Sequence, residues 1–477
     1  MASRSESGVM RPAAVATGLG AVLAGVVVAS NPYPLLVVLA VGVFVLFARG
    51  KHRGVVAGLV AVAGVNGFPL FAIGSSATIS GLRSTDVAAA GFCVLWIVWA
   101  AQDRSEHSDY STRVNSSRAV GLAIVVFATL WVAQVIRSWV FESIPLISAI
   151  LYMRTLVGIA PAFLAVRHLR TVEDRRELST VIILFASVYA VAYLVSSVTG
   201  ADMSSFTHAN RIDNAGSMVR LYAEGTQLLN LAACIGVYAV LAESSRRSRP
   251  IRLVTGVLFV LAVLAQQGRS NIVSLVIGLI IVFLMDKSRG RDSELLSRNV
   301  LNAAIAALIV VAVVITAGPS IRGLIDVTRA RATSAVIEIT SLSGNFGYRV
   351  GILSILIEML LRNPLLGVGF LHPEVHYVAG LPGGSIVNSD LGGVGILITM
   401  GALGALAYYS APVILARIAR LQLEVLSVEE RGVLAYLIAA VLAAPLLLPA
   451  PVFSGALIGW LCSGMRADRP TSAILDL

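Results

Sequence analysis

Long apolar runs recur along the chain from Pro12 to Trp460, and they restrict its fold more than any other feature. The chain is 57% hydrophobic and only 13% charged, whereas an ordinary soluble protein carries about 25% charged residues. In lipid only helices and closed β-barrels satisfy the backbone, and these runs lack the alternation of barrel strands. The sequence therefore predicts an all-α protein, a polytopic transmembrane helix bundle.

About fourteen spans are predicted, and residues 1–477 form a single integral membrane domain because no linker or fixed-period repeat divides them. The first apolar run is longer than the core of a usual signal peptide, so we interpret it as an uncleaved span. The expected spans are 12–30, 34–48, 54–73, 86–101, 119–136, 145–166, 178–199, 225–243, 253–267, 271–285, 299–317, 391–411, 432–448 and 451–464.

The arrangement of basic residues predicts the orientation. With a cytoplasmic N-terminus, about 25 of the 36 basic residues fall on the inner side, as the positive-inside rule requires. The expected location is therefore the plasma (inner) membrane, multi-pass, with both termini cytoplasmic. The inner segments are the two ends of the chain and residues 49–54, 102–118, 167–177, 244–252, 286–298 and 417–431.

The same orientation places residues 318–390 outside the membrane as one long extracytoplasmic loop over the expected active site. Inside it, the run from Val350 to Leu361 is too short to span a bilayer, which takes about 20 residues. We expect an interfacial helix that begins near Asn345 and stops before Pro364. Its apolar stripe is expected at Tyr348, Ile352, Ile355 and Met359.

Arginines on the outer side exceed what topology explains. Arg220 and Arg269 join five arginines of the long loop, and a guanidinium fork matches phosphate oxygens, so the expected partner is an anionic substrate. For Arg269 the alternative is snorkelling to lipid phosphates. Arg154 falls inside an expected span, where a structural ion pair and a role in a substrate pathway are both open. The loop arginines are Arg322, Arg329, Arg331, Arg349 and Arg362.

Four segments, in this order, resemble the O-antigen ligase and Wzy-type polymerase family: "RLYAEGTQLLNLA" (220–232), "QQGRSNIVSLVIGL" (266–279), "YRVGILSILIEMLLRNPLLGVGF" (348–370) and "NSDLGGVGILITMGALGAL" (388–406). The resemblance covers about 40% of the chain. It implies a GT-C-like fold and an integral membrane glycosyltransferase that uses undecaprenyl-diphosphate-linked sugars. It also implies inverting stereochemistry.

By this resemblance, Arg220, Arg269 and Arg349 bind the donor diphosphate. The physical argument agrees, because the leaving diphosphate carries about two negative charges and fixed donors stabilise charge that develops in the transition state. With arginines in that role, and no pair of carboxylates on the outer side, neither a metal nor another cofactor is expected.

The sequence departs from the family where a histidine usually precedes an Asn-Ser pair, because this position is Val387. The general base must then come from elsewhere. A histidine suits the work near neutral pH. For each candidate, a solvated loop residue is the alternative. The candidates are His376, His372, Glu374 and, as an outside choice, Asp390.

The predicted function is transfer of a polyprenyl-diphosphate-linked glycan to a hydroxyl of a glycan, lipid or protein acceptor, on the outer face, in cell-surface polysaccharide biosynthesis. Polymerase and ligase share the site and stay open. The other expected partners are membrane lipids, and nucleic acid is not expected because the basic residues sit in topology-setting loops. Two alternatives remain: a transporter or flippase of an anionic lipid-linked substrate, and a non-catalytic scaffold for envelope assembly.

Overall fold

The protein is described by a computed structural model. The described residues are 52–65, 84–106, 115–141, 144–145, 158–169, 171–199, 210–215, 218–222, 226–242, 249–265, 269–287, 333, 336–337, 340–341, 344–370, 393–423, 426–443 and 451–465. The helices in them are α3 (Arg53–Ala63), α4 (Ser84–Glu106), α5 (Asn115–Phe141), α7 (Ile159–Val166), α8 (Val172–Thr199), α10 (Thr226–Ala242), α11 (Arg249–Ala265), α12 (Arg269–Lys287), α15 (Gly344–Arg362), α16 (Gly393–Leu421), α17 (Val428–Ala443) and α18 (Pro451–Gly464).

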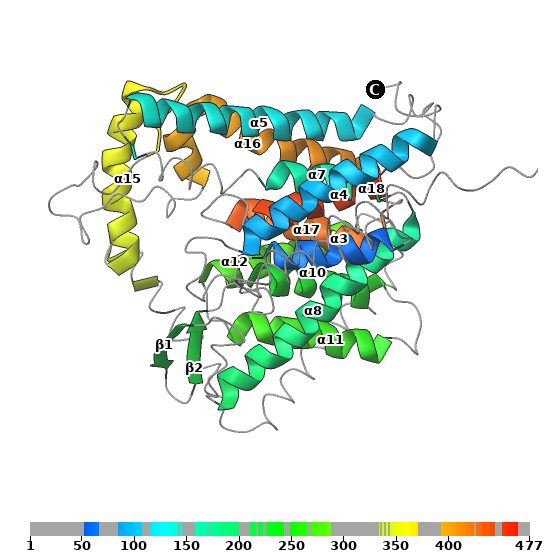
Figure 1. Cartoon of the computed structure of the whole chain (residues 1–477). Helices are drawn as coiled ribbons and strands as arrows, with labels where there is room; N and C mark the ends of the chain where they lie inside the picture. The colour runs from blue at the N-terminus through cyan, green and yellow to red at the C-terminus, as the bar shows by residue number, and fades with distance from the viewer. Residues whose placement is uncertain are drawn as a thin grey trace, which may run out of the picture.

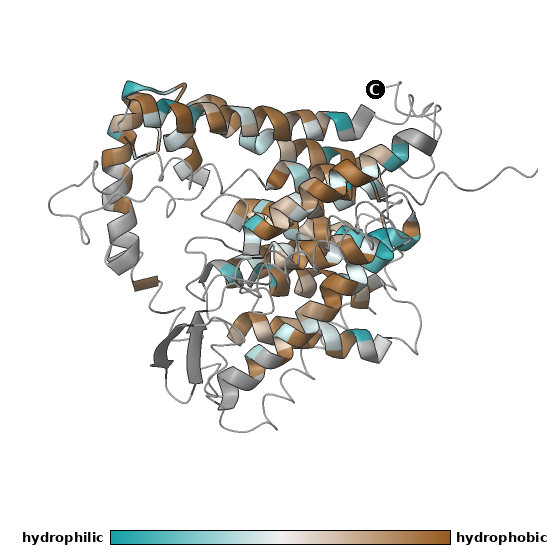
Figure 2. Cartoon of the chain, viewed as in Figure 1, coloured by the Kyte–Doolittle hydropathy of each residue, from teal (hydrophilic) through white to brown (hydrophobic). Residues whose placement is uncertain are grey.

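The expected helical bundle is confirmed in the described part of the chain. Figure 1 shows most helices lying side by side, with α5 and α16 along one edge and α8 and α11 along the opposite edge. Figure 2 shows that apolar residues predominate along most of these helices. Among the described residues, three stretches are long and apolar enough to cross a membrane, namely Thr85–Asp103, Arg118–Phe141 and Gly395–Leu421. The chain is therefore a helical membrane protein.

Eleven of the fourteen expected spans have a helix among the described residues, although only the last part of 145–166 is described. The expected spans 12–30, 34–48 and 299–317 lie outside the described residues, so the total of fourteen stays a prediction.

Helices α8 and α17 each begin with a capping box, several residues before the apolar run that predicted the helix. The Thr171 hydroxyl accepts the Asp174 N–H at 3.0 Å, and the Asp174 carboxylate accepts the Thr171 N–H at 3.3 Å. Ser427 and Glu430 repeat the pattern before α17. Such reciprocal bonds satisfy the unpaired N–H groups of a first turn, so the polar residues ahead of the apolar run also become helical.

Small residues let neighbouring helices approach closely, as is common in membrane bundles. Gly236 of α10 faces Gly256 of α11, and a Cβ on Gly236 would lie 3.0 Å from the Gly256 Cα. Gly455 of α18 packs directly on the backbone of Ile159 in α7, where a Cβ would overlap the carbonyl. A polar or bulky residue at either position would separate a helix pair.

The short helix expected between Asn345 and Pro364 is confirmed as α15, which lies across the direction of the bundle helices in Figure 1. Among its described side chains Leu356 is the most buried, and it packs on Val368 and Ile398. Ile355 and Met359 of the expected stripe are only half-buried beside it, while the side chains of Tyr348 and Ile352 lie outside the described residues.

One short hairpin adds to the helices of the described chain. Strands β1 (Asn210–Ala215) and β2 (Met218–Tyr222) pair antiparallel, with an irregularity between Arg211 and Asp213. The hairpin lies within the segment between the spans 178–199 and 225–243, for which the sequence predicted a loop.

Helix α16 is broken at Gly401, whose φ of 64° and ψ of −166° are not helical. A break leaves backbone groups on both sides without partners inside the helix. The segment 363–370 supplies these partners, and we call this arrangement the interlock. Its hydrogen bonds run from Val368 N–H to Ile398 O (2.8 Å), Gly369 N–H to Thr399 O (3.0 Å), Ala402 N–H to Pro364 O (2.9 Å) and Leu403 N–H to Leu365 O (3.2 Å).

The interlock needs glycine at its two points of closest approach. A Cβ on Gly401 would overlap the Leu365 carbonyl, and a Cβ on Gly367 would overlap the backbone around Gly401. Both glycines also have positive φ, 64° and 73°, which other residues adopt only at a cost. The sequence "NPLLGVGF" (363–370) therefore serves to fill the break in α16.

We predict that Gly401→Ala destabilises the protein, because it combines a disfavoured φ, costing roughly 1–2 kcal/mol, with overlap against the 363–370 backbone. The matched control is Gly351→Ala in α15, where no atom lies within 4 Å of the added Cβ and helix propensity improves by about 1 kcal/mol. Thermal unfolding of the detergent-purified variants should show a lower midpoint for Gly401→Ala and an unchanged or higher one for Gly351→Ala. Equal midpoints for Gly401→Ala and wild type would contradict the interlock.

Candidate functional site

The three arginines expected to bind the diphosphate lie on three separate elements. Arg220 is in β2, where it pairs with Asp213 of β1. Arg269 is the first residue of α12, and Arg349 lies in the first half of α15. Their backbones are described, but their side chains lie outside the described residues.

Chain connectivity brings these three elements to one end of the bundle. Strand β2 ends three residues before α10 begins. Helices α10, α11 and α12 pack on one another and follow one another after short gaps in the sequence. They therefore alternate in direction, and the first residues of α10 and of α12 lie at the same end of the bundle. Figure 1 shows the hairpin and α15 together on the left, beyond the ends of the bundle helices. The arrangement is consistent with a shared pocket, which stays a prediction.

The expected base candidates His372, Glu374, His376 and Asp390 lie outside the described residues, as do Val387 and Arg154. The interlock nevertheless holds the chain on both sides of this segment. Phe370, the last described residue before this segment, is two positions from His372. After the segment, α16 begins at Gly393, three positions after Asp390.

Polar side chains of α5 bind the interlock, a contact that the sequence did not predict. The Gln134 amide donates to the carbonyl of Leu366 in the segment 363–370 and to that of Thr399 in α16, just before the break. Arg137 donates to Gly367 O at 3.1 Å. A polar cluster within the otherwise apolar "FATLWVAQVIRSWVF" (127–141) is the signal that would have pointed to this face.

Ser138 completes this contact at the downstream end of the interlock. Its hydroxyl accepts the Phe370 N–H at 2.8 Å, and the Phe370 ring packs edge-on against Trp131 with centroids 4.7 Å apart. Phe370 is thus held to α5 through both its backbone and its side chain.

A cavity of about 160 Å³ lies beside the interlock. Its volume is well below the roughly 300–1,000 Å³ of typical ligand pockets, and its wall is mostly apolar, so it does not suit a sugar diphosphate. It is lined by Leu130, Ala133, Gln134, Arg137, Leu366, Met400, Leu403 and Gly404. Among the described residues, no three His, Cys, Asp or Glu side chains group as a metal site requires.

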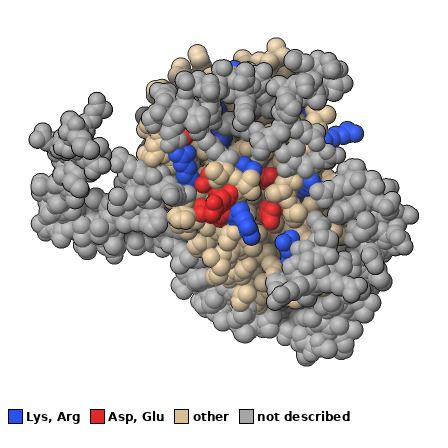
Figure 3. Space-filling view, turned by 90° about the vertical axis from the view of Figure 1, so that its right-hand side faces the viewer, with Lys and Arg blue, Asp and Glu red and all other residues tan. Residues whose placement is uncertain are grey.

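Charged side chains concentrate at the opposite end of the bundle. Helix α8 has 28 residues, a length of about 42 Å, and it runs from this charged end toward the hairpin, where it contacts β2. Figure 3 shows acidic and basic side chains gathered on this end. They come from four of the segments expected on the inner side, namely 49–54, 102–118, 167–177 and 417–431.

Asp103 is the centre of one largely buried cluster of this charged end. Its carboxylate binds Arg53 at 3.2 Å and His168 at 2.6 Å, while Arg53 also lies over the Trp99 ring. These contacts join α3, α4 and the end of α7.

Two further ion pairs tie α8 into the same end. Arg175 binds the buried Glu430 at 2.9 Å. His52 binds Glu177 at 2.7 Å, and this hydrogen bond, together with the carboxylate's charge, raises the pKa of His52.

We predict that Asp103→Asn lowers the free energy of unfolding by about 3 kcal/mol, because it leaves the largely buried Arg53 without its counter-charge. The matched control is Glu358→Gln, which breaks an ion pair with Arg362 in which both side chains are 74% exposed and which contributes at most about 0.5 kcal/mol. Denaturant unfolding in detergent measures both. A change for Asp103→Asn no larger than that of the control would show that the charged end does not stabilise the fold.

The described structure defines a helical membrane protein with a broken helix and an interlock near one end and a charged cluster at the other. The O-antigen ligase family model matches residues 254–409, about a third of the chain, so this part of the chain is similar to that family. No curated protein matches the chain. The matched part runs from α11 to α16 and contains Arg269, Arg349 and the interlock, whereas Arg220 lies before it. The expected family resemblance is therefore confirmed, and it indicates a glycosyltransferase-type enzyme of polysaccharide biosynthesis.

Proposed function

We propose that the protein transfers a glycan from undecaprenyl diphosphate to an acceptor hydroxyl on the extracytoplasmic face, in cell-surface polysaccharide biosynthesis. The observation that carries this proposal is the family match over 254–409, because it includes two of the three expected diphosphate-binding arginines and the interlock beside the expected base candidates. The acceptor is a glycan or a lipid.

The arginines act on the leaving group. Arg269 and Arg349, with Arg220, bind the diphosphate oxygens and stabilise the charge that grows as the glycosidic bond breaks. Their elements lie together at one end of the bundle, as this role requires. Arginine keeps its charge in a partly desolvated site and supplies several fixed donors, so the transfer needs no metal ion.

The acceptor hydroxyl attacks the anomeric carbon from the side opposite the diphosphate, which inverts the configuration. A base removes its proton, and we place this base among His376, His372, Glu374 and Asp390, with a histidine preferred for its pKa near neutrality. The proton passes to the base, and the electron pair of the broken bond leaves with the polyprenyl diphosphate.

The orientation follows from the two ends of the bundle. The charged cluster draws on segments rich in basic residues, so we place it, with both termini, in the cytoplasm of a cell with a plasma (inner) membrane. The hairpin, α15 and the segment 318–390 then face outward, where the lipid-linked glycan and its acceptor meet.

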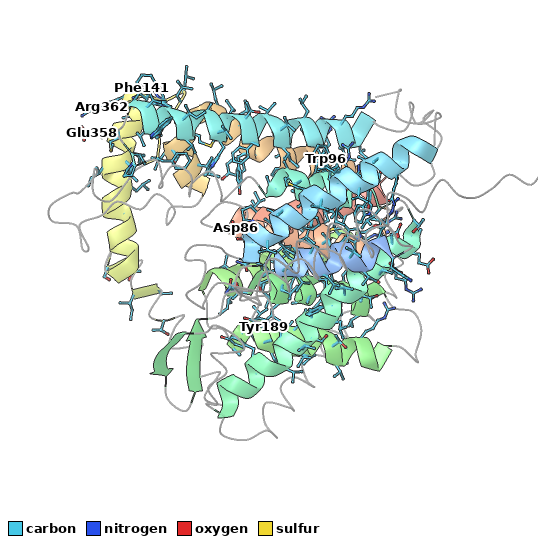
Figure 4. The ribbon with its side chains drawn as sticks, in the orientation of Figure 1. Asp86, Trp96, Phe141, Tyr189, Glu358 and Arg362 are labelled. Atoms are coloured by element: carbon cyan, nitrogen blue, oxygen red, sulfur yellow. The ribbon has the colours of Figure 1, made fainter. Side chains whose placement is uncertain are left out.

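We predict that Arg269→Ala and Arg349→Ala each lower the rate of glycan transfer by about 100-fold or more, since each removes a charged donor to the leaving diphosphate. Arg362→Ala is the matched control, because this arginine of α15 points outward with Glu358 and both are exposed (Figure 4). The assay follows a labelled glycan from undecaprenyl diphosphate to acceptor with purified protein. If wild type transfers and Arg269→Ala transfers equally well, the proposed site is wrong.

The same preparation separates the alternative functions. A transporter or flippase would move the labelled lipid across a liposome membrane without forming a glycosylated acceptor. A scaffold would do neither, and the absence of the usual histidine at Val387 is the observation that keeps this alternative in view.

A further inference from the structure

Two side-chain amides of α10 are buried and have no hydrogen-bond partner among the described residues. The unpaired atoms are Oε1 of Gln227 and Oδ1 of Asn230, and Asn230 is only 4% exposed. Buried polar groups are almost always hydrogen-bonded, because an unpaired group loses its bonds to water and gains none in return. Helix α10 precedes the part of the chain that the family model matches, so the match assigns no role to either amide.

The two amides lie on the face of α10 that packs against α12. Gln227, Asn230 and Cys234 recur every three or four residues and therefore form one stripe of the helix. A Cβ on Gly278 of α12 would lie 2.7 Å from the Cys234 Sγ atom, so this stripe contacts α12. Because α10 and α12 run in the same direction, one turn back from this contact brings Asn230 to the level of Ser274, which is also buried.

This level is close to the first residue of α12, which is Arg269. Ser274 follows Arg269 by five residues, a rise of about 7.5 Å along the helix axis. Helix α10 begins shortly after β2, the strand that contains Arg220. The unpaired amides of α10 therefore lie within two helical turns of the end of the bundle where the diphosphate is expected.

The chemistry of these amides complements that of the arginines. Polar side chains inside a membrane bundle are costly, and they commonly mark the path or the site of a substrate. A side-chain amide is uncharged and both accepts and donates hydrogen bonds, so it suits hydroxyl groups better than phosphates. A polyprenyl-diphosphate-linked glycan presents both chemistries side by side, because a hydroxyl-rich sugar is attached directly to the charged diphosphate.

We propose that Gln227 and Asn230 bind hydroxyl groups of the donor sugar next to the diphosphate, and thereby contribute to the choice of donor. This inference rests on the proposed function and names the part of the donor that α10 recognises. A site that hydrogen-bonds a substrate hydroxyl discriminates strongly against an analogue without it, because the buried polar groups of the site are then left unpaired.

The test measures the binding of two probes to purified protein. The probes are undecaprenyl diphosphate and the undecaprenyl-diphosphate-linked glycan of the transfer assay. Asn230→Leu should weaken binding of the glycan-linked probe about tenfold and leave binding of undecaprenyl diphosphate unchanged, since only bonds to the sugar are lost. Gln227→Leu, at a half-buried position, should act in the same direction. Arg269→Ala should weaken the binding of both probes.

Tyr436→Phe is the matched control. The Tyr436 hydroxyl of α17 is also buried without a hydrogen-bond partner among the described residues. It lies deeper, because α17 begins at the charged end and Tyr436 precedes Ala439, which lies 3.5 Å from an added Cβ on Gly278. Tyr436→Phe should leave the binding of both probes unchanged. Like Asn230→Leu, it should keep or raise the thermal unfolding midpoint, because each change removes an unpaired buried polar group.

Two results would overturn this inference and leave the proposed function standing. The first is binding of the glycan-linked probe by Asn230→Leu and Gln227→Leu that equals wild type while Arg269→Ala weakens it; the amides would then bind structural water only. The second is an equal loss of both probes in the two amide variants. Binding of both probes by Arg269→Ala that equals wild type, or a wild type that binds neither probe, would instead overturn the proposed function.

Discussion

A helix broken inside a membrane must find partners for its freed backbone groups, and this constraint governs the part of the protein that the family match covers. The break at Gly401 takes four hydrogen bonds from the segment 363–370. Because those bonds need close backbone contact, glycine occurs at 367 and 401. Because the segment 363–370 follows directly on α15, the same bonds tie the end of α15 to α16. The interlock thus joins α15, which carries Arg349, to α16.

The two ends of the bundle are held together by different kinds of interaction. At the charged end, buried carboxylates such as Asp103 and Glu430 join helices that are far apart in sequence, and each has a basic partner that offsets its desolvation. At the other end, the segment 363–370 is held by backbone bonds and by the side chains of Gln134, Arg137 and Ser138 of α5.

Periodicity and length predicted most of the helices, and Pro364 predicted the end of α15, because these signals are local. Capping boxes at Thr171 and Ser427 are also local, yet an apolar-run criterion overlooks them, so two helices began earlier than expected. The interlock was not predicted, since it pairs 363–370 with 398–403 and with α5, and no local signal encodes such pairing. The pocket shared by Arg220, Arg269 and Arg349 stays a prediction, as does the base.

The central claim is that these three arginines bind one diphosphate. A cryo-EM structure of the protein with a non-hydrolysable undecaprenyl-diphosphate sugar analogue tests it most directly. The account predicts the diphosphate at the end of the bundle that carries the hairpin and α15, with the guanidinium groups of Arg220, Arg269 and Arg349 within about 3 Å of its oxygens. A diphosphate bound at the charged end, or arginines that point away from it and from one another, would contradict the account.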